Sequence, residues 1–340
     1  MLAERLTAQL LAGPAAADPC AVAERLLAIQ AQDPRGARLA VRARTAGGSA
    51  ADVDRALTDD RTLVITWVNR GTLHLIRRED YPLLQALTTP QLATANARRL
   101  SQEGVDPHAA ERGVAVIEAA LTDAGALTRD QLREHLDAAG VPTAGQALVH
   151  LLFLASLRGL VVRGPLVGRH QAFVLVRDWL GETAAIDRDR ALAELARRYL
   201  AGHGPASERD LAIWAGITLR DARAGLGAIA ADLRDAGGGL VDLAGRGAAA
   251  PIPPPRLLGP FDAVLHGWRD RAWVAGDHAG IVTSNGIFRP IMLVGGRAAG
   301  TWSMPRGDVV LQPFGRLARA DRAALDADGA DAARYLGAGR

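Results

Sequence analysis

The sequence predicts a mainly helical protein with some β structure: tandem winged-helix modules followed by a small C-terminal β-rich domain. Three observations support this fold class. Helical periodicity dominates the first 235 residues. An outline of helices followed by a short hairpin recurs at intervals of about eighty residues, which is typical of tandem modules. After the proline-rich stretch 251–255, the pattern changes to short strands separated by glycine turns.

The composition is that of a soluble globular protein. The chain has 340 residues, of which 49% are apolar and 23% charged. No apolar run is long enough to cross a bilayer, and the first residues lack the basic and apolar regions of a signal peptide. The single cysteine, Cys20, cannot form an intrachain disulfide. We therefore expect a cytoplasmic protein without a membrane partner.

The basic residues are biased, because all 40 are arginine and none is lysine. The net charge is only +3. A GC-rich genome, whose codons favour arginine, accounts for most of this bias. The functional alternative is phosphate contact, because a planar guanidinium binds an oxyanion through two hydrogen bonds. Either way, no lysine amine is present to form a Schiff base with a sugar carbon, which excludes lysine-dependent strand cleavage.

The first expected module covers residues 1–104. Apolar residues recur at three- and four-residue spacings as far as residue 31, and Pro34 and Gly36 then break the pattern. Two runs with strand character follow, joined by a tight turn at Asn69-Arg70-Gly71. The expected elements are helices over residues 4–12, 20–31 and 50–57 and strands over 62–68 and 72–76.

The second and third expected modules cover residues 105–182 and 183–250. Thr128 and Ser207 are suited to cap a helix N-terminus, and Gln131 completes a capping-box pattern with Thr128. The expected elements are helices over 107–122, 145–158 and 191–200, helices starting near 128, 207 and 217, and strands over 161–165, 173–176 and 240–243.

The last expected domain covers residues 257–340 and follows a stiff, extended proline linker. Short apolar runs between glycine turns predict a β-rich domain closed by a helix. The expected elements are strands over 272–275, 280–282, 290–294, 299–302 and 309–311 and a helix over 318–335.

The motif Gln30-Ala31-Gln32 is the most informative short segment. A carboxamide is a poor proton acceptor, yet it holds and polarises a water, which suffices for a substrate primed to break, such as a nucleobase made cationic by alkylation. Residues two apart in a helix point about 200° from one another. The pair therefore converges only if the backbone leaves helical geometry, which Pro34 favours at Asp33. The alternative is a solvated helix end.

The turn after the first predicted hairpin strand carries residues suited to DNA. Arg70, Gly71 and Thr72 offer one guanidinium, one hydroxyl and exposed amides for phosphate contact. An ordinary polar turn is the alternative. His74 follows on the second strand. A core or surface histidine is favoured there over a catalytic one, and a hydrogen bond to phosphate is the remaining alternative.

A second candidate DNA contact lies at residues 267–271. Arg269 and Arg271 are suited to gripping DNA, with the interleaved Asp270 orienting them. A surface cluster of salt bridges is the alternative. Asp262 and Asp270 do not make a convincing acid/base pair, because the sequence does not place them together.

The sequence contains no motif typical of a metal site, a phosphate-binding loop or a serine hydrolase. The histidines are scattered and Cys20 is alone, so no metal-ligand spacing is present. No glycine-rich phosphate loop follows a predicted strand, and the Gly-x-Ser-x-Gly elbow of hydrolases is absent. We therefore expect neither a metal nor another cofactor.

Taken together, these segments resemble the AlkZ/YcaQ-type bacterial DNA glycosylases, a family of tandem winged-helix proteins. The matching segments follow one another in order from residue 29 to residue 302, so the resemblance covers most of the chain. They are Ile29–Pro34, Thr66-Trp67 with Arg70–His74, Leu258–Asp262 with Gly267–Arg271, and Phe288–Pro290 with Gly300–Trp302.

The resemblance implies an activity and a site. In that family a Gln-apolar-Gln or Gln-apolar-Asp motif carries the chemistry, which points to Gln30 and Gln32, with Ala31 smaller than a bulkier aliphatic residue. It implies removal of N7-alkylated guanine, including bulky adducts and some interstrand crosslinks, from double-stranded DNA, and we expect a monomer. The alternatives are a winged-helix transcriptional regulator and a self-resistance protein that sequesters adducts without catalysis.

Overall fold

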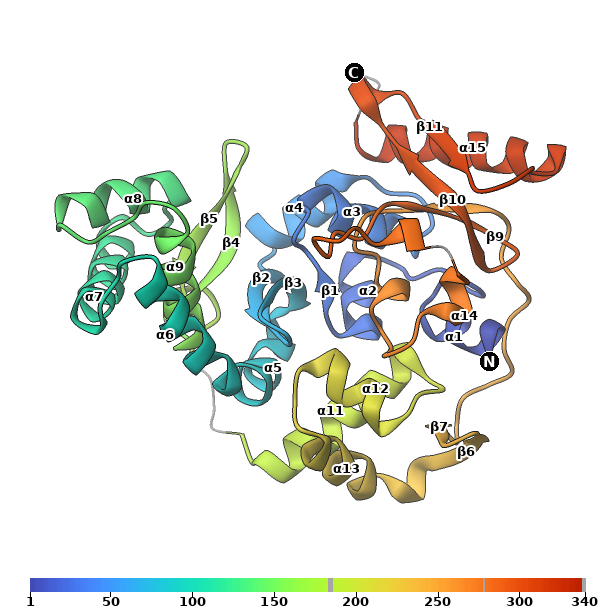
Figure 1. Ribbon diagram of the computed structural model, residues 1–340, viewed down its shortest axis with the longest axis horizontal. Helices are drawn as coiled ribbons and strands as arrows, with labels where there is room; N and C mark the ends of the chain where they lie inside the picture. Colours follow the sequence, from blue (N-terminus) through green and yellow to red (C-terminus); the bar gives the residue numbers. More distant parts are fainter. Residues whose placement is uncertain (183–185, 278, 338–340) are drawn as a thin grey trace. The chain divides into compact units, whose positions relative to one another are not determined.

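The computed structural model describes residues 1–182, 186–277 and 279–337. The chain divides into two compact units: unit 1 comprises Met1–Val53 and Asp189–Arg340, and unit 2 comprises Asp54–Arg188. Both units combine helices with small antiparallel sheets, which confirms the mixed fold class (Figure 1). The assignment of three winged-helix modules stays a prediction, and its boundary at residue 183 lies outside the described residues.

Unit 2 is organised on a sheet in which β3, β2, β4 and β5 are neighbours in that order. Every residue of β2 is buried, and β2 pairs with β3 from Leu63↔Arg77 to Val68↔Thr72. The elements are α4 (Ala50–Thr58), which starts at the end of unit 1, β2 (Leu63–Val68), β3 (Thr72–Arg77), α5 (Tyr81–Thr88), α6 (Ala93–Gln102), α7 (Pro107–Ala124), α8 (Arg129–Ala138), α9 (Ala147–Leu157), β4 (Val161–Val167), β5 (His170–Leu175) and α10 (Val176–Trp179).

Most predicted elements of unit 2 are confirmed within a few residues. The capping box is also present: Gln131 Oε1 accepts from the Thr128 amide at 2.8 Å, and Thr128 Oγ1 accepts from the Gln131 amide at 3.4 Å. Helices α5 and α6 were not predicted. Both are short, and Pro82 and Pro90 interrupt the segment that they share, which weakens its helical pattern.

Unit 1 combines the two ends of the chain. A second sheet has the order β11-β10-β9-β8, and β6 pairs with β7 in a separate hairpin. The elements are α1 (Leu2–Ala8), α2 (Pro19–Leu26), β1 (Ile29–Gln30), α3 (Pro34–Arg42), α11 (Arg188–His203), α12 (Glu208–Ala215), α13 (Leu219–Ala228), β6 (Leu233–Gly237), β7 (Leu240–Leu243), β8 (Arg256–Leu258), α14 (Ala272–Ala275), β9 (Ile291–Val294), β10 (Arg297–Ser303), β11 (Val310–Pro313) and α15 (Arg319–Tyr335).

The predicted helix over residues 20–31 is wrong in its second half. The helix ends at Leu26, and Leu27 has a φ of 64°, which no α-helix accommodates. Pro34 does not end a helix but begins α3, where its missing N–H costs nothing. Asp33 caps this helix, since its Oδ1 accepts from the Gly36 amide at 2.8 Å.

Two predicted strands of the C-terminal region are also wrong. Residues 272–275 form helix α14, and residues 279–281 form a short 3₁₀ helix. An apolar run of four residues does not distinguish strand from helix. Asp270 decides the outcome, because its Oδ1 accepts from the Ala272 amide at 2.8 Å and starts a helical turn.

The core of unit 1 joins residues that are far apart in the chain. Leu39 of α3 packs with residues of β8, β9, β10 and α15. The buried members of this cluster are Leu39, Leu257, Met292, Trp302, Leu325 and Ala332. Across the described ranges, no helix combines the length and apolar character needed to cross a membrane.

Candidate active site and DNA-binding residues

Gln30 and Gln32 lie on non-helical backbone between α2 and α3. Gln30 belongs to β1 and Gln32 to the bend that follows, so the condition for convergence is met and the alternative of a helix end is wrong. Gln30 is 8% exposed, whereas Gln32 is exposed. Within the described part of the chain, the Gln30 carboxamide has no hydrogen-bond partner. Neither of its polar atoms is among the buried side-chain atoms without a partner, so the carboxamide is in contact with solvent.

The start of α3 fixes the segment that carries the two glutamines. A Cβ added to Gly36 would lie 2.5 Å from the carbonyl oxygen of Pro260, and one added to Gly259 would lie 2.8 Å from Cβ of Leu39. Glycine at both positions lets the two backbones touch. The start of α3, which directly follows the segment 29–34, thus packs against the segment 258–262 within unit 1.

A buried ion pair holds the end of α3 against the same segment. Arg44 Nη2 and Nη1 donate to the two carboxylate oxygens of Asp262 at 2.8 and 2.9 Å, and both side chains have 0% exposure. Asp262 also accepts from the Val264 amide. Asp262 is therefore part of the scaffold, and neither it nor the exposed Asp270 is placed for acid/base work. Sequence reasoning missed Arg44, because no local pattern marks its partner 218 residues away.

The hairpin turn at residues 69–71 is packed rather than exposed. Asn69 is fully buried with a φ of 57°, and its amide donates to Thr88 Oγ1 at 2.8 Å. A Cβ on Gly71 would lie 3.2 Å from the ring of Phe153. Arg70 is half-buried. Among the residues expected to offer amides, Gly71 donates its amide to the Val68 carbonyl oxygen at 3.1 Å within the turn.

The residues after the turn are fixed within β3. His74 is 3% exposed, and its Nδ1 lies 2.8 Å from the Thr72 carbonyl oxygen. A carbonyl only accepts, so Nδ1 carries the proton in this contact. Thr72 itself is half-buried, and its hydroxyl oxygen has no hydrogen-bond partner in the described part of the chain.

Thr66 and Trp67 of the same motif are structural in this molecule. Thr66 Oγ1 and Ser156 Oγ share a hydrogen bond of 3.0 Å. The guanidinium of Arg163 lies 5.0 Å from the centre of the Trp67 ring, and burial lowers the pKa of Arg163 to about 10. The two residues fasten β2 to α9 and β4.

The segment 267–271 presents one exposed arginine. Arg269 is exposed, and its amide donates to Asp210 Oδ1 at 2.9 Å. Arg271 is half-buried, with Nε donating to the Leu265 carbonyl and its guanidinium 5.1 Å from the centre of the Phe288 ring. Asp270 accepts from the Ala272 amide at the start of α14 and makes no hydrogen bond or ion pair with either arginine in the described chain, which corrects the prediction. This segment forms no ion pair with the described residues, so the alternative of a salt-bridge cluster is also wrong.

Trp268 ties this segment to α11. Its Nε1 donates to the carbonyl oxygen of His203 at 2.9 Å, and a Cβ on Gly267 would lie 2.5 Å from the His203 ring. His203 is completely buried and stacks on Tyr199 at 4.8 Å. Burial disfavours the charged ring and lowers the pKa of His203 to about 3. His203 is a core residue that sequence reasoning did not identify.

The predicted site residues are divided between the two units. Gln30, Gln32, Arg269 and Arg271 belong to unit 1. The hairpin residues Arg70, Gly71, Thr72 and His74 belong to unit 2.

Comparison with known proteins supports the sequence resemblance. A model of the family described as "DNA glycosylase AlkZ-like" matches residues 23–335. The "Interstrand DNA cross-link repair glycosylase" of Streptomyces sahachiroi is 28% identical, over 96% of this chain and 92% of that protein. The solved structure of S. sahachiroi DNA glycosylase AlkZ superposes with a TM-score of 0.81 at 26% identity, covering 99% of this chain and 95% of that one. The chain belongs to the AlkZ-like family of DNA glycosylases.

Proposed function

We propose that this DNA glycosylase hydrolyses the N-glycosidic bond of cationic N7-alkylguanine in double-stranded DNA and leaves an abasic site in an intact strand. Gln30 and Gln32 are the proposed catalytic residues. Arg70, Gly71, Thr72, His74, Arg269 and Arg271 are the proposed DNA contacts.

The position of the Gln30 carboxamide is the main observation in support of the proposal. Gln30 is 8% exposed and has no hydrogen-bond partner in the described ranges of the chain. Its oxygen and nitrogen are not among the buried side-chain atoms that lack a partner, so the carboxamide reaches solvent and can accept and donate hydrogen bonds there. A water or a substrate atom held between Gln30 and the exposed Gln32 would make such a hydrogen bond.

The chemistry needs little help from the protein because the lesion supplies the electrophile. Alkylation at N7 places a positive charge on guanine, so the base departs as a neutral molecule when the bond from N9 to C1′ breaks. The sugar passes through an oxocarbenium-like state. The carbonyl dipoles of Gln30 and Gln32 stabilise that positive charge and hold the water whose oxygen bonds to C1′, while its proton goes to solvent.

The product follows from the composition. A bifunctional glycosylase that uses lysine forms a Schiff base with C1′ and then cleaves the strand. All 40 basic residues here are arginine, which does not supply such a nucleophile at neutral pH. The proposed reaction therefore stops at hydrolysis.

We extend the proposal to bulky adducts and interstrand crosslinks. The S. sahachiroi relative is named as an interstrand crosslink repair glycosylase. A base joined to the opposite strand is difficult to flip into a pocket. A pair of neutral carboxamides that acts on the sugar from outside the helix suits such a lesion, because the glycosidic bond is reached without extruding the base.

The test is release of the base from a duplex that carries a single N7-methylguanine. The wild-type protein is expected to release free 7-methylguanine and to leave a site that breaks on heating but not before. Gln32→Ala is expected to lower the single-turnover rate by at least about 100-fold, as removal of one positioned polar group does in other enzymes. Equal release by a folded Gln32→Ala variant would refute the role of the pair.

The matched control is Gln312→Ala, an exposed glutamine in β11 whose loss leaves the rate unchanged. A duplex with unmodified guanine at the same position shows whether the cationic charge is required. Release from that duplex at a similar rate would contradict the proposed mechanism even if both glutamines were essential.

A further inference from the structure

Unit 1 contains a cavity whose lining includes none of the residues proposed for catalysis or DNA contact. It has a volume of about 740 Å³, and its wall is made by residues of α1, α2, α11 and the loop that follows β7. Three of the wall residues are arginines: Arg25, Arg197 and Arg246. A neighbouring cavity of about 500 Å³ shares Arg25 with it. Guanidinium groups that line a cavity are suited to an anionic ligand.

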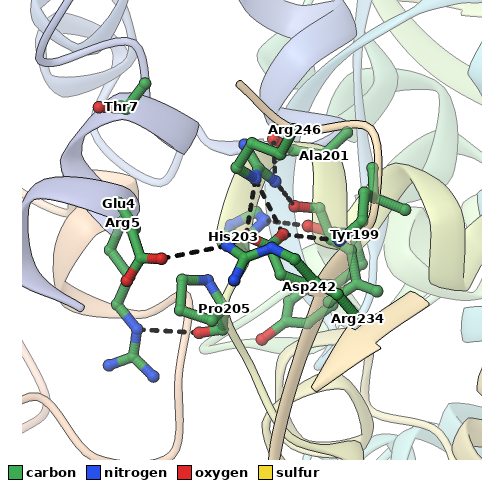
Figure 2. Close-up of polar contacts among 12 residues, drawn as sticks. Glu4, Arg5, Thr7, Tyr199, Ala201, His203, Pro205, Arg234, Asp242 and Arg246 are labelled. Carbon is green, nitrogen blue, oxygen red and sulfur yellow. Dashed lines mark hydrogen bonds and ion pairs between the residues drawn. The ribbon is translucent and has the colours of Figure 1, made fainter. Parts of the chain in front are cut away.

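Arg246 is a fixed donor on this wall. Its side chain is 10% exposed, and Nε donates to both carboxylate oxygens of Asp242 at 2.8 and 2.9 Å. Nη2 donates to the carbonyl oxygens of Leu200 and Ala201 near the end of α11; Figure 2 labels Arg246 and Ala201. In the described part of the chain, Nη1 of Arg246 has no acceptor. The guanidinium is therefore held rigidly with one nitrogen left for a ligand.

Arg25 is the arginine of this wall that forms no ion pair among the described residues. It is half-buried in the last turn of α2, and no carboxylate or carbonyl of the described residues accepts from its guanidinium. Burial lowers the pKa of Arg25, the positive charge of Arg246 lowers it further, and the negative charge of Glu24 opposes both effects. Two guanidinium groups of like charge near one cavity repel each other, and an anion between them removes that repulsion.

The other charges on the wall are already neutralised. Arg197 donates to Asp232 at 2.7 Å, and both residues line the cavity. Asp242 balances one charge of the pair formed by Arg234 and Arg246, and Glu4 pairs with Arg234 at 3.1 Å (Figure 2). Arg25 forms no ion pair with a described residue, although the negative charge of Glu24 acts on it, so it is the least compensated arginine of the wall.

We infer that this cavity binds a phosphate group, with Arg25 and Nη1 of Arg246 as its two ligands. The two nitrogen-rich groups match the two non-bridging oxygens of a phosphodiester or the oxygens of a phosphate monoester. The source is either the backbone of the bound DNA or a free phosphate-bearing molecule. The inference of a DNA source rests on the proposed function, whereas the phosphate site does not.

The position of Arg25 in the chain allows a DNA source. Gln30 follows Arg25 by five positions, so their Cα atoms lie at most about 18 Å apart, the length of the fully extended segment. Duplex DNA advances about 3.4 Å per base pair. A phosphate about five base pairs from the lesion is therefore within reach of the cavity when C1′ lies at the glutamine pair.

The experiment compares the intact wild-type protein with three variants. Arg25→Gln removes the charge. Ala248→Glu places a carboxylate at an exposed position of the cavity wall and keeps both arginines, so it remains informative if Arg25→Gln folds poorly. Arg220→Gln removes an equally isolated, exposed arginine of α13 that does not line the cavity, and it is the matched control.

Two probes separate the sources. Inorganic phosphate, against sodium chloride of equal ionic strength, is expected to raise the Tm of wild type and Arg220→Gln but not that of the two cavity variants. A duplex carrying N7-methylguanine is expected to bind Arg25→Gln about tenfold more weakly than wild type, with a salt slope smaller by about one. Loss of the phosphate effect with unchanged DNA affinity assigns the cavity to a free phosphate-bearing molecule. Weaker DNA binding by both cavity variants without a phosphate effect assigns it to DNA.

The inference is overturned if the two cavity variants match Arg220→Gln with both probes. Its failure is distinguishable from failure of the proposed function, which is read from release of 7-methylguanine by the wild type. If the wild type releases the base but Arg25→Gln changes neither phosphate nor DNA binding, only the phosphate site is refuted. If the protein binds phosphate through Arg25 but releases no base, only the glycosylase mechanism proposed for the glutamine pair is refuted.

Discussion

Arg44 and Asp262 form a two-pronged ion pair in the interior of unit 1, although 218 residues separate them in the chain. The pair connects the end of α3 to the segment that follows β8. Because α3 begins two residues after Gln32, the pair supports the helix on which the proposed catalytic segment depends. Both members of the pair are needed for stability, because a buried charge without its partner is strongly unfavourable.

The first prediction concerns this pair. Asp262→Asn leaves the Arg44 charge buried and uncompensated, so the free energy of unfolding is expected to fall by about 3–5 kcal/mol. Urea denaturation followed by circular dichroism measures it. Asp326→Asn breaks the exposed pair with Arg322 and is expected to cost less than about 1 kcal/mol. Similar losses of unfolding free energy for the two variants would show that the buried pair stabilises the protein no more than the exposed pair does.

The second prediction uses the contact between α3 and Pro260. Gly36→Ala places a methyl group 2.5 Å from a backbone oxygen, so the backbone has to move and the protein is expected to lose about 1–3 kcal/mol. Base release should slow as well, because the Gln30–Gln32 segment moves with the start of α3.

Gly227→Ala is the control for that contact. Gly227 lies within α13 and has no atom within 4 Å of an added Cβ, so alanine is expected to stabilise the protein by about 0.5–1 kcal/mol. Thermal unfolding of both variants gives the comparison. Stabilisation by Gly36→Ala would contradict the packing described here.

The third prediction is a loss of stability in acid caused by His203. Its pKa is lowered from 6.5 to about 3 in the folded protein. Between these values the unfolded chain binds one more proton than the folded chain, so stability is complete above pH 6.5 and falls as the pH decreases toward 3. The slope from this residue approaches about 1.4 kcal/mol per pH unit.

His203→Phe tests the assignment, because phenylalanine fills the aromatic cluster and does not titrate. Its stability should change less steeply with pH between 6.5 and 4 than that of the wild type, in urea titrations at each pH. His108→Phe replaces an exposed histidine and should leave the slope unchanged. Parallel curves for wild type and His203→Phe would exclude His203 as the cause.

The fourth prediction distinguishes carboxamides from carboxylates at the proposed site. Neither glutamine titrates, so the single-turnover rate of the wild type is expected to vary less than about threefold between pH 6 and pH 8.5. Gln30→Glu introduces a buried carboxyl group whose ionisation is disfavoured, and its rate should depend on pH. A bell-shaped wild-type profile would point to a titrating base that the proposal lacks.

The fifth prediction concerns Arg269. Arg269→Ala is expected to weaken binding to alkylated and unmodified duplexes alike and to reduce the slope of log K against log salt by about one. Arg220→Ala is the control for a general change of charge. An unchanged slope for Arg269→Ala would remove this residue from the proposed DNA contacts.

The local chemistry of the chain determined much of the secondary structure. The strands over 63–68 and 72–77 follow from β-branched runs around a short turn, and α8 begins at Thr128 because its capping box involves residues three apart. The order of the motifs from residue 29 to residue 302 was enough to indicate the family. Each of these features depends on neighbours in sequence, which the sequence displays directly.

Tertiary contacts decided the remainder. The Gln30-Ala31-Gln32 segment looks like a helix end until Leu27 is placed at a φ of 64°, and the burial of Gln30 depends on what packs around it. Gly36 looks like a helix breaker, whereas its role is the contact with Pro260. Arg44 carries no signal of its own. Partners hundreds of residues apart contribute no local pattern, so only the folded chain brings such groups together.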